Sequence, residues 1–274
     1  MSDVTTSHES LSASGDIRGH RSIAVAAAVN NDDVLCHNLG ASPVFREEKI
    51  PLIAERGYSS AGRAYNHTLD TSAVEMIVFA HQDVYLPKGW FGRLQAAVEV
   101  LETRREKWAV LGIVGVDRHG VLVGRSWSNG QQMKINAEVT TPTPVQSIDE
   151  LVIVLHRTPG LRFDDDLPGF HLYGTDIVQS AIAAGLGAYV FDGPVVHNSL
   201  PVIHLDDSYR RAYRYMQRKW RAKLPIHTTI VPIMRFGWAL FCWEVRSRIW
   251  TLRESPTTQR CASPARMAQE LGYE

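Results

Sequence analysis

Short apolar runs separated by helical patterns organise the first half of the chain. Three runs, at residues 23–29, 50–54 and 74–79, are almost free of polar residues, which predicts strands buried on both faces. Residues 61–69 and 88–105 carry apolar positions at helical spacing and predict helices. This alternation of strands and helices indicates right-handed crossovers and a mainly parallel sheet.

The second half of the chain departs from this alternation. Residues 108–116 predict a further strand, and the turn-like sequence at 117–120 predicts that the chain returns along it as a hairpin. Residues 145–156 and 188–192 contain further apolar runs, with a helix predicted from Thr175 between them. We therefore expect an α/β protein in which a mainly parallel half is followed by a mixed sheet.

Polar residues follow the predicted parallel strands at their carboxyl ends, where open α/β sheets bind ligands. The first strand is followed by Asn30, and both helix capping and ligand contact are open interpretations of this side chain. The second strand is followed by Glu55, and the third ends in the trio His81, Gln82 and Asp83. The sequence thus predicts a polar site at one edge of the sheet.

Composition adds few constraints. The chain has 274 residues, of which 45% are hydrophobic, enough for a sizeable core. Lys plus Arg and Asp plus Glu both number 29, so no charge excess favours nucleic acid as a partner. The three cysteines are far apart and form no ligand-like pair, which fits a reducing, cytoplasmic setting without disulfides.

The two ends of the chain differ in character from its middle. Residues 1–20 are rich in Ser and Thr and lack an apolar core, so we expect a disordered tail rather than a signal peptide. Residues 206–223 are basic and aromatic, which in a neutral protein favours a surface helix over nucleic-acid binding. Residues 230–252 mix aromatics with arginines and predict an amphipathic helix that packs on a second subunit or lies on a membrane surface. Residues 255–274 predict a loose tail.

Several segments in order resemble glycosyltransferase family 2, and more narrowly the subgroup whose strand ends in His-Gln-Asp. The resemblance covers about residues 23–226. The segments are SSAGRAYNHTLD (59–70), VFAHQDVYLP (78–87), FHLYGTDIVQSAIAAGLGAYV (170–190), VVHNS (195–199) and RKWRAKLPI (218–226).

The resemblance implies a GT-A fold. In that fold a Rossmann-like, mainly parallel sheet with helices on both faces binds a nucleotide-sugar, and a smaller mixed sheet holds the acceptor. The corresponding domain would span 21–226, with a nucleotide-sugar half at 21–116 and an acceptor half at 117–226. The amphipathic C-terminal helix would then occupy 227–254.

The resemblance also implies a metal. Asp83 matches the last carboxylate of the family's Asp-x-Asp motif, and His197 matches a histidine that supplies a further ligand in several relatives. An aspartate and a histidine suit Mn²⁺ or Mg²⁺, which would bridge the two phosphates of the donor. This chain has His81 where many relatives have a second aspartate, which implies weak metal affinity in the absence of donor.

By the same resemblance, Asp176 matches the general base that deprotonates the acceptor hydroxyl, so that the sugar is transferred with inversion. From the residues alone, complementing a helix dipole is an equally good role for Asp176. The implied donor pocket contains Asn30, Glu55, Ala61, Asn66, Gln82 and Asp83. The implied acceptor side contains Trp127, Asp149, Glu150, His171 and Tyr173.

The expected activity is therefore transfer of a sugar from a nucleoside diphosphate, with uridine favoured as the base, to a hydroxyl acceptor on a glycan, a lipid-linked glycan or a protein. Because the metal motif is incomplete, a non-catalytic relative that binds sugar nucleotides or glycans is the alternative. A phosphohydrolase that uses His81 and Asp83 is a third interpretation, but the sequence offers no second cluster of His and Asp ligands for it.

Overall fold

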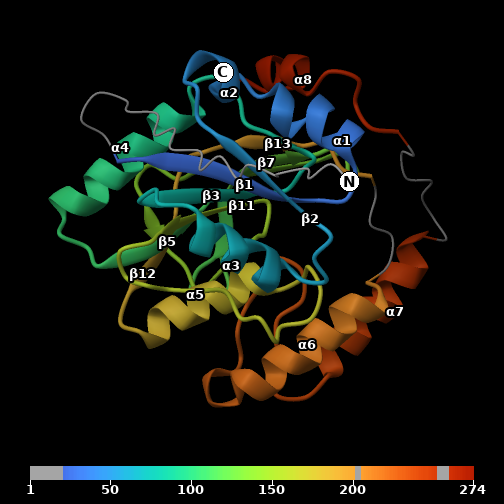
Figure 1. Ribbon diagram of the computed structural model, residues 1–274. Coiled ribbons are helices and arrows are strands. Elements are labelled where there is room, and N and C mark those ends of the chain that lie inside the picture. Colours follow the sequence, from blue (N-terminus) through green and yellow to red (C-terminus); the bar gives the residue numbers. More distant parts are fainter. Residues whose placement is uncertain (1–20, 201–204, 252–258) are drawn as a thin grey trace, which may run out of the picture.

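The computed structural model describes residues 21–200, 205–251 and 259–274, so the tails predicted over 1–20 and 255–258 lie outside the described residues. Two sheets and their covering helices make up this part of the chain (Figure 1). The elements are β1 (Ile23–Val29), α1 (Asp32–His37), η1 (Leu39–Ala41), α2 (Val44–Glu47), β2 (Leu52–Arg56), α3 (Ala61–Thr71), β3 (Met76–Ala80), β4 (Val84–Tyr85), α4 (Trp90–Thr103), β5 (Trp108–Gly112), β6 (Val114–Val116), β7 (Leu122–Ser128), β8 (Met133–Ala137), β9 (Thr143–Pro144), β10 (Ser147–Ile148), β11 (Val152–His156), α5 (Tyr173–Ala183), β12 (Gly187–Val190), β13 (Val195–His197), α6 (Asp207–Lys219), η2 (Arg221–Lys223), α7 (Trp238–Thr251) and α8 (Pro264–Glu270).

The larger sheet has the strand order β2-β1-β3-β11-β5-β12-β9. Its neighbours β2, β1 and β3 pair in parallel, as do β5 and β12, whereas β11 lies antiparallel between β3 and β5. The sheet is therefore mainly parallel, as the alternation of apolar runs predicted. Between β1 and β2 the chain forms three short helices, α1, η1 and α2.

Hydrophobic clusters cover both faces of this sheet. Along β1, Ala26 belongs to the cluster that includes residues of α3 and α5, while Val25 and Ala27 belong to the cluster that includes residues of α4. Figure 1 shows α3 and α5 on one side of the strands and α4 on the other. A strand buried on both sides has no polar face, which is why the run in β1 is continuously apolar. The expected α/β class, with helices on both faces of a mainly parallel sheet, is confirmed.

The smaller sheet has the order β10-β6-β7-β13-β4, with β8 added beside β7. It is mixed, since β13 pairs in parallel with β7 and antiparallel with β4. The single strand predicted at 108–116 is in fact two strands, β5 in the larger sheet and β6 in the smaller one. Two glycines allow close packing there: a Cβ atom on Gly112 would lie 2.8 Å from Ile148, and one on Gly115 would lie 2.5 Å from the carbonyl oxygen of Ser147.

The prediction of a loose C-terminal tail is wrong for residues 259–274, because this segment is packed. Ala268 is fully buried, and Tyr273 is 1% exposed. Both residues form a small hydrophobic cluster with Tyr85 of β4 and Val196 of β13. The segment is short and its few apolar side chains gain burial only against strands distant in the sequence, so no local pattern indicates the packing.

Helix α7 lies within the range predicted for an amphipathic helix. Leu240 is buried against the main cluster, whereas Trp238 and Phe241 are exposed. No helix in the described part of the chain is both long and apolar enough to cross a membrane.

Candidate functional site

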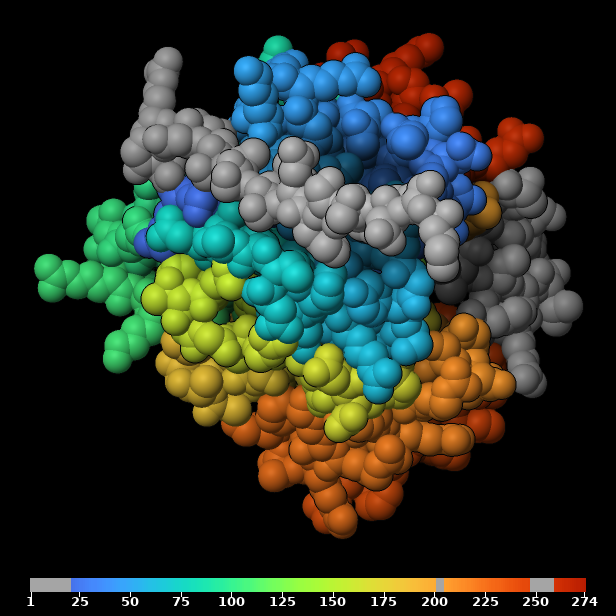
Figure 2. All heavy atoms as spheres, in the orientation of Figure 1, coloured from blue at the N-terminus to red at the C-terminus, as the bar shows by residue number. Residues whose placement is uncertain are grey.

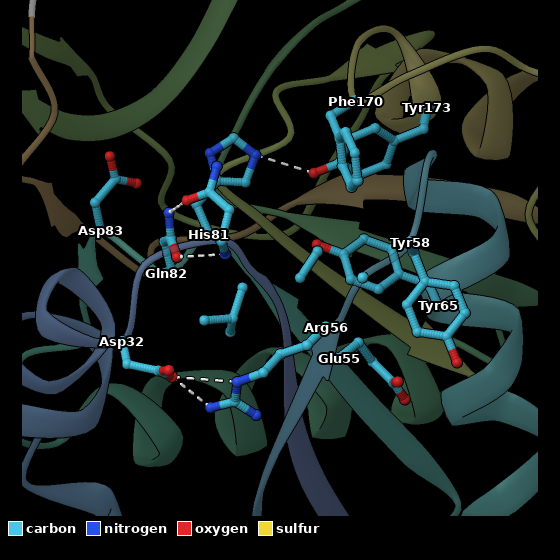
Figure 3. A pocket seen from close by; sticks show the side chains of 14 residues that line it. Asp32, Glu55, Arg56, Tyr58, Tyr65, His81, Gln82, Asp83, Phe170 and Tyr173 are labelled. Atoms are coloured by element: carbon cyan, nitrogen blue, oxygen red, sulfur yellow. Dashed lines mark hydrogen bonds and ion pairs between the residues drawn. The ribbon is translucent and has the colours of Figure 1, made fainter.

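A cavity of about 630 Å³ opens at the carboxyl ends of β1, β2 and β3 (Figure 3). This is the edge of the sheet at which the sequence predicted a polar site. It also meets the start of α5, so it lies between the parallel strands and the segment that follows residue 169. The residues that line it are Ala28, Val29, Asn30, Asp32, Glu55, Arg56, Gly57, Tyr58, Tyr65, His81, Gln82, Asp83, Phe170 and Tyr173.

Gln82 ties the ends of β1 and β3 together at the cavity. Its Oε1 atom accepts hydrogen bonds from the backbone N–H groups of Asn30 and Asn31, both at 3.1 Å. Its Nε2 atom donates to Oδ1 of Asn30 at 2.5 Å. Asn31, rather than an aspartate, caps α1 by accepting from the N–H of Val34. Both Asn30 and Gln82 therefore line the cavity while holding each other in place.

Glu55 lines the cavity but is bonded to α3. This buried carboxylate accepts a hydrogen bond from Oγ1 of Thr68 at 2.6 Å and lies 3.0 Å from Nδ1 of His67. Next to it, Arg56 forms an ion pair with Asp32 at 2.5 Å across the mouth of the cavity. The charged side chains of Glu55 and Arg56 are thus already paired with other protein groups.

Ala61 and Asn66 do not line the cavity. The N–H of Ala61 donates to the carbonyl oxygen of Gly169. Asn66 is buried and holds the loop between β11 and α5. Its Nδ2 atom donates to the carbonyl oxygen of Phe163 and to Asp165, both at 2.9 Å. Neither residue is among those that line the cavity, and their roles at the donor stay predictions.

Three potential metal ligands meet at one side of the cavity. His81 and Asp83 follow β3, His197 ends β13, and one ligand atom from each lies within 4.8 Å of the other two. We call these three residues the His-Asp-His cluster. Asp83 and His197 approach to 3.4 Å. Nε2 of His81 lies 3.0 Å from the hydroxyl group of Tyr173, which fixes the orientation of the ring.

The pKa shifts of Asp83 and His81 suit metal binding. Burial raises the pKa of Asp83, but the neighbouring imidazoles of His197 and His81 and the guanidinium group of Arg260 outweigh it and hold the pKa below its usual range. Burial lowers the pKa of His81. An ionised carboxylate and a neutral imidazole are the forms that bind cations. Two nitrogen ligands and one oxygen ligand fit Mn²⁺ better than Mg²⁺, which prefers oxygen.

Asp176, the general base that the resemblance implied, is buried and held by residues at the end of α6. Its carboxylate is 2% exposed and absent from the cavity wall. One oxygen accepts from Nζ of Lys219 at 2.8 Å, and the other accepts from Nε1 of Trp220 at 2.7 Å. Burial raises the pKa of Asp176, and Lys219 opposes this effect. Because both oxygens are engaged by the end of α6, the observed contacts of this residue are structural.

The two acidic residues before β11 lie close to the cavity. Asp149 accepts a hydrogen bond from Oγ1 of Thr229 at 3.1 Å. Glu150 is partly exposed and lies 3.4 Å from the N–H of Gly174, next to the cavity-lining Tyr173. Burial and the charge of Asp149 raise the pKa of Glu150 to about 8. Glu150 is therefore mostly protonated at neutral pH and becomes a carboxylate that can accept a proton as the pH rises toward 8.

The other three residues predicted on the acceptor side lie in different surroundings. Tyr173 lines the cavity. His171 lies 3.6 Å from Asp206 and packs against Tyr209. Trp127 is partly exposed and packs against the small cluster that includes Ala268 and Tyr273.

Arg260 was missed by the sequence analysis. Its Nη1 atom lies 3.2 Å from Oδ2 of Asp83. It belongs to the segment that was predicted to be loose, and one arginine among 29 basic residues carries no local signal of such a contact. Only the packing of α8 brings it to the His-Asp-His cluster.

No family model matches the chain. The protein described as "ATP synthase subunits region ORF 6" of Fuscovulum blasticum is 28% identical over 153 residues, which is 54% of this chain and 61% of that protein. This chain thus spans less than two thirds of that relative.

Two solved structures show limited similarity. One is GalNAc-T7 with UDP, GalNAc and Mn²⁺, which is 9% identical with a TM-score of 0.47, over 94% of this chain and 57% of that one. The other is S. aureus TarS residues 1–349 in complex with UDP-GlcNAc, which is 12% identical with a TM-score of 0.46, over 72% of this chain and 64% of that one. Similarities at this level carry no conclusion of their own about the present chain.

Proposed function

We propose that this protein transfers a sugar from a nucleoside-diphosphate sugar, with uridine as the favoured base, to a hydroxyl acceptor with inversion. The proposal rests on the His-Asp-His cluster beside a cavity at the carboxyl ends of β1, β2 and β3. It is supported by the family 2 resemblance of the segments that form this edge. The cavity of about 630 Å³ lies in the usual size range of ligand pockets.

The cluster residues would hold a divalent cation, with Mn²⁺ favoured. When bound, such an ion neutralises the negative charge that develops on the departing diphosphate. Asp83 supplies the anionic ligand, while Tyr173 keeps His81 in its orientation through the 3.0 Å contact. Gln82 keeps the ends of β1 and β3 at a fixed separation, so that the donor enters a preformed pocket.

We propose Glu150, in place of Asp176, as the general base that takes the proton from the hydroxyl group of the sugar acceptor. Asp176 is enclosed by Lys219 and Trp220. Glu150 is partly exposed beside Tyr173, and with its pKa raised to about 8 it is ionised and able to accept the proton as the pH rises toward 8. The enclosure of Asp176 also favours the second candidate function, a protein that binds sugar nucleotides without transferring the sugar.

Binding and transfer are tested separately. Melting temperatures of wild type and Asp83→Ala are measured with a panel of nucleoside diphosphates and nucleotide-sugars, each with Mn²⁺, Mg²⁺ or chelator. We expect one nucleotide to raise the melting temperature of the wild type only with metal, and Asp83→Ala to lose this shift. A panel without any shift would refute the donor site. Binding without transfer to any of a set of glycan, lipid-linked and protein acceptors would favour the second candidate.

A further inference from the structure

The C-terminal segment is fixed beside the His-Asp-His cluster by backbone contacts on both sides of Arg260. Nδ2 of Asn129 donates to the carbonyl oxygen of Gln259 at 2.9 Å. The side chain of Asn198 accepts from the N–H of Cys261 at 2.7 Å and donates to its carbonyl oxygen at 3.0 Å. Since α8 is itself anchored by buried side chains, the backbone at Arg260 is held at the site from both directions.

The side chain of Arg260 reaches Asp83 from this segment. Its Nη1 atom lies 3.2 Å from Oδ2 of Asp83 and also donates to the carbonyl oxygen of Asn198. The other oxygen of Asp83 faces His197 at 3.4 Å. Arg260 is 29% exposed and Asp83 is 16% exposed, so the guanidinium group is partly covered yet borders solvent.

We propose that Arg260 belongs to the donor site and binds the diphosphate of the donor when a metal ion occupies Asp83. This inference rests on the proposed function. An arginine keeps its charge at all working pH values, and its planar fork matches phosphate oxygens. Without ligand, the guanidinium group neutralises the single carboxylate of the site. A divalent cation on Asp83 repels the guanidinium group, and the anionic diphosphate provides its new partner.

This role has two consequences of opposite sign. Arg260 competes with a cation for Asp83, so it weakens metal binding when no nucleotide is present. It adds charge-assisted hydrogen bonds to the diphosphate, so it strengthens nucleotide binding in the presence of metal. A purely structural ion pair that only fastens the C-terminal segment would instead change both affinities in the same direction through a loosened site.

The experiment compares the full-length wild type with Arg260→Gln, Arg260→Lys and the control Arg266→Gln. Arg266 lies in the same segment but pairs with Glu270 on the surface of α8. Mn²⁺ affinity is measured by electron paramagnetic resonance without nucleotide, and UDP affinity by calorimetry with saturating Mn²⁺. Melting temperatures verify that each variant is folded.

For Arg260→Gln we expect several-fold tighter Mn²⁺ binding and about tenfold weaker UDP binding. Arg260→Lys should be intermediate because it keeps the charge without the fork, and Arg266→Gln should match the wild type. Unchanged affinities, or a loss of both, in folded Arg260→Gln would overturn the inference while wild-type binding keeps the proposed function intact. A wild type that binds neither ligand would overturn both.

A separate observation concerns the outer face of α7, defined by Phe236, Trp238, Phe241 and Val245. These side chains are 76%, 72%, 53% and 42% exposed, and the rings of Trp238 and Phe241 stack at 5.7 Å. The opposite side of the helix, which carries Leu240, packs against the core. In Figure 2 the orange helices α6 and α7 lie at one end of the molecule and the red segment with α8 at the other.

Unpaired positive charge surrounds this face. Arg214 adjoins Phe241 in a small groove between α6 and α7, and Arg235 directly precedes Phe236. Both Arg214 and Arg235 are exposed and have no ion-pair partner in the described ranges 21–200, 205–251 and 259–274. Because the whole chain is neutral, this basic surface is a local feature.

We infer that the outer face of α7 docks on an anionic lipid surface. Aromatic side chains would enter the interfacial region while the arginines pair with lipid phosphates. This docking does not depend on the transferase activity.

Vesicle co-sedimentation tests the docking. The wild type should bind vesicles that contain phosphatidylglycerol, with weaker binding at high salt, and should not bind neutral phosphatidylcholine vesicles. The double variant Trp238→Ser with Phe241→Ser should lose binding, while Val121→Ser, at another exposed apolar side chain, should retain it. Absence of binding, or equal binding to neutral vesicles, would overturn the inference. So would a dimer in size-exclusion chromatography that the double variant disrupts, because the face would then be a contact between two copies.

Discussion

Tyr273 provides a direct test of how the C-terminal segment is attached. The side chain is 1% exposed, and it packs with Tyr85, Val196 and Ala268. Tyr273→Ala would leave a cavity worth about 3–5 kcal/mol if the surroundings stayed in place. Because the segment is terminal, it can detach instead, so the loss in global stability is limited to the free energy that attaches residues 259–274.

The matched control is Tyr273→Phe. The hydroxyl group of Tyr273 is buried and finds no hydrogen-bond partner within the described residues. Removing an unsatisfied polar atom relieves a desolvation penalty, so this variant should be as stable as the wild type or more stable by about 1 kcal/mol. The ring also keeps its contact with the guanidinium group of Arg125, at 5.6 Å.

Hydrogen exchange followed by mass spectrometry measures the difference between the Tyr273→Ala and Tyr273→Phe variants. In Tyr273→Ala we expect the amides of α8 to lose protection while those of β1 and β3 keep theirs, and we expect none of these amides to change in Tyr273→Phe. Detachment also withdraws Arg260, so the Ala variant should bind UDP more weakly in the presence of Mn²⁺. Unchanged protection of α8 in Tyr273→Ala, or equal damage by both substitutions, would refute the packing argument.

Three further predictions concern the site and its supports. Because the pKa of Glu150 is raised to about 8, transfer should increase as the pH rises through about 8, and a Glu150→Gln variant should lose this dependence along with most of its activity. Because of the same raised pKa, the stability contributed by the protonated carboxyl group is present at low pH and lost as the pH rises toward 8. In urea unfolding at several pH values, the free energy of unfolding should therefore decline less with pH in Glu150→Gln than in the wild type. Gly62→Ala should lower the melting temperature, because its Cβ atom would lie 2.2 Å from the carbonyl oxygen of Asp164; Gly92→Ala, with nothing within 4 Å in α4, should raise stability by about 0.5–1 kcal/mol. Asp176→Asn should cost on the order of 1–3 kcal/mol in urea unfolding, and a stable variant that has lost only its turnover would instead support the general-base role.

The first half of the fold is predictable from the sequence because its determinants are local. The strand at residues 23–29 coincides with β1, and the helix predicted over residues 61–69 lies within α3. Continuous apolar runs indicate strands covered on both faces, and parallel strands connected by crossovers bring their carboxyl ends together. The position of the site next to residues 81–83 follows from these two facts.

Other features depend on contacts between residues far apart in the chain. The sequence allowed Asp176 two roles, and only the approach of Lys219 and Trp220, more than 40 residues later, engages its carboxylate. Asn66 and Glu55 were both expected in the donor pocket. Glu55 lines the cavity and Asn66 does not, and both side chains have partners that a pattern cannot reveal. Hydrogen-bond partners are chosen by tertiary proximity, so the type of a polar residue does not determine its role.

The chain by itself determined a mainly parallel α/β sheet and the edge at which polar residues gather, since both follow from periodicity and chain direction. The pairing of Asp83 with His197 was expected from the family resemblance, but the tertiary structure alone decided that His81 completes the cluster and that Arg260 faces the same carboxylate. These residues come from β3, β13 and the C-terminal segment, and only the packing of the two sheets and α8 brings them within a few ångströms. Long-range packing thus determines the chemistry of the site, while local pattern determines its place.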